Sequence, residues 1–307
     1  MQIQRVLVVH RKSLYQIYVR EHRDRAVKSA LRRGDPVAQR LLASHRTQEA
    51  SLATTRRTLR SRGVRAEYCW RGEARGVKGF DLVISVGGDG TVLDTAQHIV
   101  EGPPLLGLNS DPPNSVGALC AGTADQLDAL LDAVSSGALV PTRLTRLRVR
   151  LEGRDLFGPC LNDVLFAHAC PADMTRFELG ALPLDELPER GRLLPDGVLV
   201  PVRSSGLWVA TAAGSTGGIH SAGGRTYAPH SRRVQYLVRE PYAGPGRARR
   251  SRGSASFGPK EALVVVCHVR RGMIWADGAH RRHVVPYGQT LVIDSHPSSL
   301  ELVLRRG

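Results

Sequence analysis

The segment DLVISVGGDGT, residues 81–91, joins an apolar run to a glycine-rich turn and decides the fold of the first half of the chain. Its run at residues 80–86 predicts a strand that is apolar on both sides, which is typical of a parallel sheet covered by helices. Residues 91–100, after the turn, have the pattern of a helix. The segment therefore predicts a strand–turn–helix unit of an α/β domain.

The same alternation of strands and helices continues on both sides of this segment. Further strands are predicted at residues 5–10, 66–70 and 104–109, and a helix at residues 124–135. Asp35-Pro36 is a favourable start for a long helix, and Gly63 is a favourable end. We therefore predict that residues 1–143 form an α/β domain with a parallel sheet.

The pattern changes after residue 143, where helical segments become scarce. Short apolar runs predict strands at residues 145–151, 164–168, 198–202, 207–211, 262–270, 273–275 and 290–294. Asp277-Gly278 predicts a hairpin turn. We predict a β-rich second domain over residues 144–307, whose last segment can pack back on the first domain.

Length and charge limit the classes of protein that fit. A chain of 307 residues with 42% hydrophobic residues is large enough for two globular domains. The formal net charge of +15 comes almost entirely from arginine. This charge can reflect nucleic-acid binding or the electrostatic steering of small polyanions such as ATP. It can also reflect only the arginine bias of a GC-rich genome. No RNA-recognition or zinc-finger signature is present, so we expect no nucleic-acid partner, and the arginine cluster at residues 247–252 is expected to be an exposed loop.

The cysteines and the N-terminus bear on the compartment. The five cysteines are odd in number and have no C-x-x-C spacing, which disfavours a zinc site or a disulfide framework and predicts reduced thiols. The apolar run Val6–Val9 precedes no small-residue cleavage site, and no apolar stretch approaches the ~20 residues that span a bilayer. We expect a cytoplasmic protein without a signal peptide or a membrane partner.

The turn GGDGT, residues 87–91, has the features of a phosphate-binding loop. Its glycines let the backbone approach a ligand closely, and the helix that follows offers unpaired N–H groups to phosphate. A carboxylate repels phosphate, so the presence of Asp89 in a phosphate-binding loop needs a separate reason. A suitable one is to accept a proton from a sugar hydroxyl that attacks phosphorus. A plain strand-to-helix turn capped by Asp89 fits the local pattern as well.

Two later segments have the composition of ligand-binding loops. Residues 214–224, GSTGGIHSAGG, consist mostly of small and hydroxyl residues, which can wrap a ligand or form an ordinary flexible loop. Asn162 and Asp163 lie at the start of a predicted strand. They can bind a ribose diol or simply form a turn.

Together these three segments resemble the NAD kinase family, which carries a G-G-D-G-T loop, an N-E or N-D pair and a G-S-T-x-x-x-x-S-A-G-G segment in this order. The resemblance extends from about Asp81 to Ile293, and the last segment is its most specific part. The motifs NSDP, SVG, WVATAAGST and VREP are similar to a divergent branch with animal mitochondrial NAD kinase and plant NADH kinase; they occupy residues 109–112, 115–117, 208–216 and 238–241.

The resemblance implies an α/β domain joined to a β-rich domain and a role for each matching position. Asp89 would be the general base that activates the 2′-hydroxyl of the adenosine ribose. The nucleotide loop would include Gly87, Gly88 and Thr91. The residues that would bind the dinucleotide are Gly90, Asn162, Asp163, Arg203, Thr216, Gly217, Gly218 and Ser221.

Family members are dimers or tetramers that use ATP or inorganic polyphosphate with a divalent cation. The resemblance therefore implies NAD or NADH as substrate, ATP as donor, Mg²⁺ or another divalent cation as cofactor, and a homodimer or larger homo-oligomer. No residue of this chain is assigned as a metal ligand.

Three departures from the family pattern leave the choice between NAD and NADH open. The usual R-S-D-G is Arg203-Ser204-Ser205-Gly206 here, the tyrosine of G-S-T-A-Y is Gly218, and D-G-Q is Asp277-Gly278-Ala279. Two alternatives to an NAD(H) kinase remain. A diacylglycerol-type lipid kinase shares GGDGT but should have a membrane-binding surface, and no amphipathic anchor is present. A non-catalytic nucleotide sensor is also possible, but a carboxylate such as Asp89 beside phosphate would contribute little to binding alone.

Overall fold

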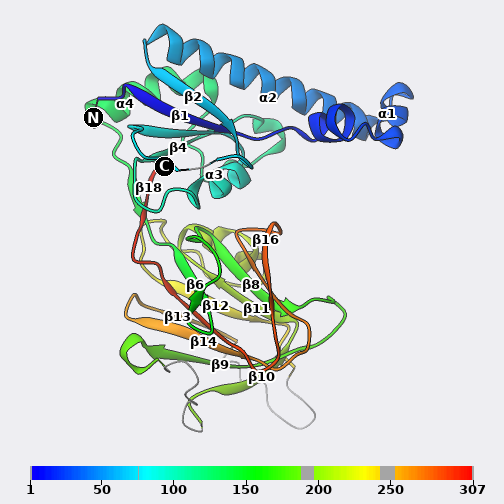
Figure 1. Cartoon of the computed structure of the whole chain (residues 1–307), viewed down its shortest axis with the longest axis vertical. Coiled ribbons are helices and arrows are strands. Elements are labelled where there is room, and N and C mark those ends of the chain that lie inside the picture. Colours follow the sequence, from blue (N-terminus) through cyan, green and yellow to red (C-terminus); the bar gives the residue numbers. More distant parts are fainter. Residues whose placement is uncertain (1, 75, 188–196, 243–252, 306–307) are drawn as a thin grey trace. The chain divides into compact units, whose positions relative to one another are not determined.

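The computed structural model describes residues 2–74, 76–187, 197–242 and 253–305 (Figure 1). The chain divides into two compact units, Met1–Thr142 with Glu301–Gly307, and Arg143–Leu300. The first unit thus includes the C-terminal end of the chain. The arginine cluster at residues 247–252 lies outside the described residues.

One six-stranded sheet forms the centre of the first unit. Its strands are β1 (Arg5–His10), β2 (Arg65–Trp70), β3 (Leu82–Gly87), β4 (Leu105–Asn109), β5 (Thr142–Leu144) and β18 (Leu300–Val303). They follow the order β2-β1-β3-β4-β18-β5, in which β1 to β4 are parallel neighbours and β18 is parallel to β4. Because parallel strands end at the same edge, the segments that follow β1 to β4 meet there.

Helices cover both faces of this sheet. The longer ones are α1 (Arg25–Arg32), α2 (Pro36–Ser61), α3 (Asp89–Ala96) and α4 (Leu127–Ser136), and short π or 3-10 turns lie at Gln16–Glu21, Pro112–Asn114 and Ala124–Gln126. Leu52 of α2 and Leu131 of α4 pack with alternate residues of the sheet such as Leu106. The neighbouring Gly107 points to the opposite face, where α3 lies (Figure 1), and a Cβ on it would come within 2.9 Å of Val92.

The long helix α2 buries polar residues alongside Leu52 and Leu59. Leu41 and Leu42 are only half-buried, whereas His45 and Gln48 are buried. The Nδ1 atom of His45 lies 2.9 Å from the hydroxyl oxygen of Ser13. A buried polar group with a partner costs little, so these residues can occupy core-facing positions.

The second unit consists mainly of two six-stranded antiparallel sheets. The first contains, in spatial order, β10 (Val200–Ser204), β9 (Thr175–Pro183), β14 (Glu261–Cys267), β17 (Thr290–Ser295), β6 (Leu147–Leu151) and β7 (Arg154–Asp155). The second contains β13 (Ser254–Phe257), β12 (Val234–Arg239), β11 (Gly206–Ala210), β8 (Asp163–His168), β15 (Gly272–Ala276) and β16 (Arg281–Val285). Its short helices are η4 (Leu184–Glu186), η5 (Ala213–Thr216) and α5 (Gly218–Ser221).

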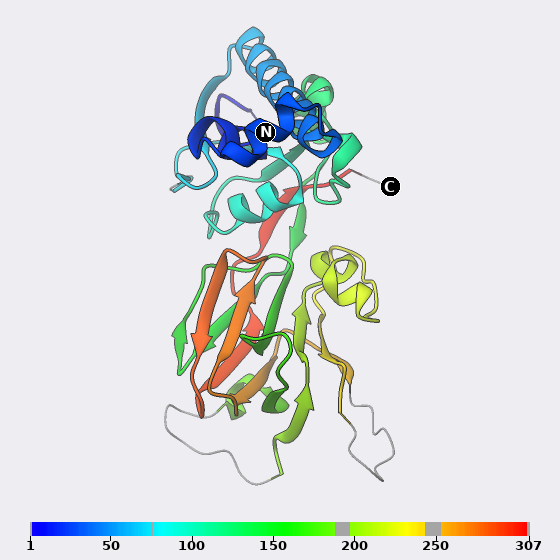
Figure 2. The ribbon, with the colours of Figure 1, turned by 90° about the vertical axis from the view of Figure 1, so that its right-hand side faces the viewer.

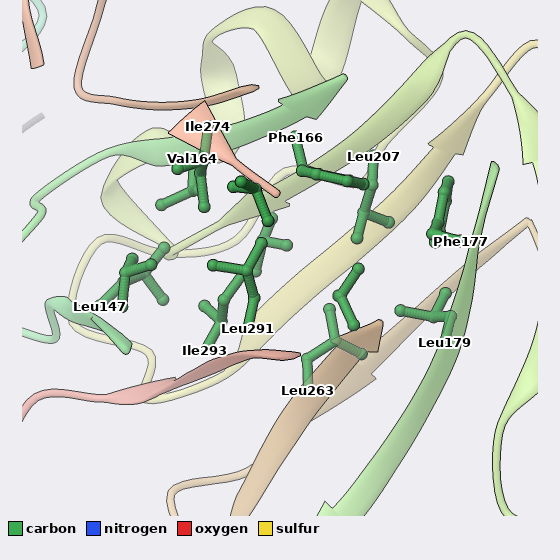
Figure 3. Packing of buried hydrophobic residues seen from close by; sticks show 14 of the residues in the cluster. Leu147, Val164, Phe166, Phe177, Leu179, Leu207, Leu263, Ile274, Leu291 and Ile293 are labelled. Carbon is green, nitrogen blue, oxygen red and sulfur yellow. The ribbon is translucent and has the colours of Figure 1, made fainter. Parts of the chain in front are cut away.

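The two sheets of the second unit share one apolar core (Figure 3). Leu263 of β14 and Ile293 of β17 face Ile274 of β15 in this core. The rings of Phe166 and Phe177 meet edge to face with their centroids 5.6 Å apart. Such a pair contributes about 0.5–1.5 kcal/mol beyond its burial, so it helps to join the two sheets.

The predicted fold class is confirmed, since a parallel α/β sheet precedes a β-rich second half. The predicted strands of the second half correspond within a few residues to β6, β8, β10, β11, β14, β15 and β17. Asp277-Gly278 lies in the turn between β15 and β16, as predicted. The sequence patterns did not predict β7, β9, β12, β13 or β16.

The pairing of β18 with β4 predicts that the C-terminal strand stabilises the first unit. Leu302 is fully buried, so Leu302→Ala is expected to lower the free energy of unfolding of this unit by about 2–5 kcal/mol. Arg305→Ala, at an exposed position, is the control and should change it by less than about 0.5 kcal/mol. Urea unfolding followed by circular dichroism measures both. Equal effects would show that β18 is not part of the core.

Candidate active site

The GGDGT loop joins β3 to α3 in the first unit and is built by close contacts. A side chain on Gly87 would collide with the side chain of Thr91, and a Cβ on Gly88 would lie 2.5 Å from the hydroxyl oxygen of Ser115. Gly87 therefore has no room for a side chain, and a side chain on Gly88 would force the Ser115 hydroxyl to move. Gly90, at the first turn of α3, is exposed.

The carboxylate of Asp89 is held by a second loop of the same unit. Its Oδ2 accepts a hydrogen bond of 3.0 Å from the amide of Ala118, and its Oδ1 accepts one of 2.8 Å from the amide of Leu119. The helix itself has no side-chain cap, so Asp89 does not act as the cap of a plain turn. Each carboxylate oxygen keeps a further lone pair, which leaves Asp89 able to accept a proton from a ligand.

In the second unit, the Asn162–Asp163 pair and the glycine-rich segment lie next to each other. β8 begins at Asp163 and pairs with β11, which ends directly before the segment. The amide of Thr211 donates to the carbonyl of Asn162 over 2.9 Å, and a side chain on Gly214 would collide with that same backbone. Gly214 is therefore required by the close approach of two chain segments.

Four of the eight predicted dinucleotide residues lie together here, and we call them the ribose cluster: Asn162, Asp163, Thr216 and Gly217. A Cβ on Gly217 would lie 3.6 Å from Oδ2 of Asp163. The Oδ1 atom of Asn162 is buried and has no hydrogen-bond partner within the described part of the chain. An unpaired buried acceptor of this kind is suited to a ligand hydroxyl.

Gly218 and Ser221 lie in α5, the short helix that follows this cluster (Figure 2), and both are exposed. A Cβ on Gly218 would lie 3.0 Å from the ring of Trp208 on β11. The indole therefore occupies the space beside the position where the family usually has tyrosine.

Arg203 does not join the ribose cluster within this chain. It lies on β10 before the start of β11, whereas the cluster follows the other end of that strand. The ends of β11, which has five residues, are four steps of about 3.3 Å, or roughly 13 Å, apart. A role for Arg203 in binding the dinucleotide stays a prediction.

Asp277 belongs to the candidate site, although the motif comparison assigned it no role and noted only that the family's D-G-Q is altered at this position. Its carboxylate accepts hydrogen bonds from the amides of Leu161 at 2.8 Å, Asn162 at 2.7 Å and Asp163 at 3.3 Å. Arg281 lies 3.0 Å away and pairs with it. Asp277 therefore fixes the backbone that carries the ribose cluster.

Burial raises the pKa values of the carboxyl groups of Asp277 and Asp163. The pKa of Asp277 is raised by burial, against the opposing effects of Arg281 and the three backbone amides. Burial and the charge of Asp277 raise the pKa of Asp163 to about 7. Asp163 can therefore change its protonation state near neutral pH.

Neither a metal cage nor a membrane span is found within the described ranges. No group of three His, Cys, Asp or Glu side chains there could hold a metal ion. No helix in these ranges is long and apolar enough to cross a bilayer.

A glycine-rich loop with a held carboxylate, on an α/β unit followed by a β-rich unit with a cluster of polar residues, is typical of a nucleotide-dependent phosphotransferase. Residues 2–138 match the model of the ATP-NAD kinase N-terminal domain. The chain is 36% identical over 239 residues to a probable NADH kinase of Oryza sativa subsp. japonica, covering 73% of this chain and 71% of that relative.

Two solved structures have a similar fold. The yeast NADH kinase complexed with NADH has a TM-score of 0.69 at 14% identity, covering 100% of this chain and 85% of that one. An NAD kinase from Archaeoglobus fulgidus in complex with ATP has a TM-score of 0.65 at 20% identity, covering 99% and 94%.

The chain belongs to the NAD kinase family. This confirms the family, and the NAD(H) kinase activity, that the motifs predict. It also favours this family over the lipid kinases that share GGDGT.

The buried pair of Asp277 and Arg281 predicts a large stability effect. Asp277→Asn leaves the Arg281 guanidinium without its carboxylate partner and should lower the free energy of unfolding of the second unit by about 3–5 kcal/mol. The double variant Asp277→Asn with Arg281→Met should lose less than the sum of the single variants. Urea unfolding of all four proteins tests this. Additive losses would contradict the coupling.

The raised pKa of Asp163 predicts a pH-dependent stability. The folded state binds this proton more tightly than the unfolded chain, whose carboxyl has a pKa of 3.8, so stability should fall as pH rises from about 4 to 7. Asp163→Asn cannot ionise, and its stability relative to the parent should rise across this range. Urea unfolding at about pH 4.5 and about pH 8 measures the difference. A constant difference would contradict the prediction.

Proposed function

We propose that this protein transfers the terminal phosphoryl group of ATP to the 2′-hydroxyl of the adenosine ribose of NAD or NADH, giving NADP or NADPH. The observation that carries the proposal is the carboxylate of Asp89, oriented by two backbone amides at a glycine-rich strand-to-helix loop. A relative named probable NADH kinase and similar folds solved with NADH and ATP support the same substrates.

In the proposed reaction, Asp89 accepts the proton of the 2′-hydroxyl as its oxygen attacks the terminal phosphorus. The new P–O bond forms while the bond between that phosphorus and its bridging oxygen breaks, and ADP leaves. Catalysis of this kind depends mainly on positioning and charge stabilisation. The amides of Ala118 and Leu119 contribute by fixing the direction of the carboxylate.

The ribose cluster would supply the binding of the dinucleotide. The unpaired Oδ1 of Asn162 can accept a hydrogen bond from a ribose hydroxyl, and Asp163 offers a second acceptor when ionised. The small residues Thr216 and Gly217 leave room for a ligand beside these groups. NADH is the acceptor that the name of the rice relative favours.

We further propose a homodimer or larger homo-oligomer, at work in the cytoplasm, that uses Mg²⁺ together with ATP. All five cysteines are free thiols, which fits a reducing compartment. The family resemblance supports the oligomer and the divalent cation. Size-exclusion chromatography with light scattering, and an assay with ATP or inorganic polyphosphate with and without Mg²⁺, test these points.

Removing the proposed base should stop turnover without unfolding the protein. Asp89→Asn is expected to lower kcat by about 10²–10⁴-fold, the usual contribution of a general base. Formation of NADP or NADPH from NAD and NADH, offered separately with ATP and Mg²⁺, measures this. Asp125→Asn, which changes an exposed carboxylate of the same unit, is the matched control and should leave kcat unchanged. Near-normal turnover of the Asp89 variant would remove Asp89 from this role.

A further inference from the structure

Two arginines lie at the carboxyl edge of the parallel sheet on the same side as the GGDGT loop. β1 leads directly to Arg11 and β2 to Arg71, while the neighbouring β3 leads into the loop. Ligands of open parallel sheets bind at this edge. Both side chains are partly exposed, at 26% for Arg11 and 28% for Arg71, so a ligand can reach them.

The guanidinium of Arg71 lies over the start of α3. A Cβ on Gly90 would lie 3.9 Å from Nη1 of Arg71. The same Nη1 is 2.9 Å from Oδ2 of Asp94, one helical turn further on. Asp94 therefore holds the guanidinium beside Gly90 and engages only part of its five N–H donors.

Arg11 is held from another direction. Its Nε donates to Oε1 of Gln48 over 3.2 Å, and its Nη2 lies 3.5 Å from Oδ2 of Asp111. Burial lowers the pKa of Arg11, the charge of Asp111 opposes this shift, and the charge of Arg71 adds to it. Arg11 and Arg71 are therefore close enough to repel each other, a cost that a bound anion would offset.

The GGDGT loop beside these arginines also has unsatisfied polar groups. α3 begins without a side-chain cap. The hydroxyl of Thr91 is buried and has no hydrogen-bond partner among the residues that the structure describes. It lies against Gly87, within the loop. The amides of Thr91 and Val92 donate to the carbonyl of Gly88, whereas those of Asp89 and Gly90 have no hydrogen-bond partner among the described residues. These two amides and the Thr91 hydroxyl are donors that phosphate oxygens can satisfy.

We propose that Arg11 and Arg71 bind the polyphosphate chain of the phosphoryl donor, together with the GGDGT loop. This inference rests on the proposed kinase function and names residues that its motifs do not include. The triphosphate of ATP and inorganic tripolyphosphate present the same oxygens, so the arginines recognise the phosphate chain and not the base. Asp94 and Asp111 act as positioning residues, because they fix the two guanidiniums.

Binding of the phosphate chain can be tested on the full-length protein without dinucleotide. Isothermal titration calorimetry with inorganic tripolyphosphate, and separately with ATP, measures the dissociation constant. Arg11→Gln and Arg71→Gln should each weaken both ligands by about 10- to 100-fold, as expected for charge-assisted hydrogen bonds. Arg60→Gln, at an exposed position near the end of α2, is the matched control and should leave both constants unchanged.

Steady-state kinetics of the same variants gives a readout that a merely structural role would not move. The KM for ATP should rise while the KM for NAD or NADH stays constant. Arg71→Lys keeps the charge and should recover part of the affinity. Arg11→Lys serves the same purpose if Arg11→Gln does not fold.

Unchanged affinity for tripolyphosphate in variants that fold would overturn the inference, and so would a loss confined to ATP. This outcome is separate from failure of the proposed function. A protein that binds tripolyphosphate through these arginines but forms no NADP or NADPH would contradict the kinase function and leave the phosphate site in place.

Discussion

The hydrogen bonds from the amides of Ala118 and Leu119 to the carboxylate of Asp89 are the constraint on which the first unit's site depends. They tie the loop after β3 to the loop after β4, and they are possible only because glycines let the chain turn tightly. The packing of Thr91 against Gly87 closes the turn. One side chain thus orients the loop and supplies the group that can accept a proton.

In the second unit, too, a carboxylate holds a loop of the candidate site by accepting hydrogen bonds from backbone amides. Asp277 accepts three backbone amides from the segment that carries Asn162 and Asp163, and Arg281 compensates its charge. Hydrogen bonds to a carboxylate are directional and strong, so they fix a loop more closely than apolar contacts alone. The cost is a buried charge, and burial together with this charge raises the pKa of the neighbouring Asp163.

The sequence predicted the elements whose signals are local. Continuous apolar runs such as β3 and β14 identified buried strands, and GGDGT marked the loop before α3. β9 was missed because its buried residues alternate with charged ones, as in Phe177 and Glu178, so no continuous apolar run marks it. His45 and Gln48 of α2 were not predicted as buried, since their partners lie on distant segments.

The sequence by itself determined the family and named most of the candidate site residues, because each motif depends on neighbours along the chain. Only the tertiary structure decided which distant groups hold those motifs. Asp277 reaches Leu161 across 116 positions, and parallel pairing brings Arg11 and Arg71 to one edge. The length of β11 separates Arg203 from the ribose cluster. Strand pairing and register set these distances, and they depend on packing across the whole unit, which no local pattern encodes.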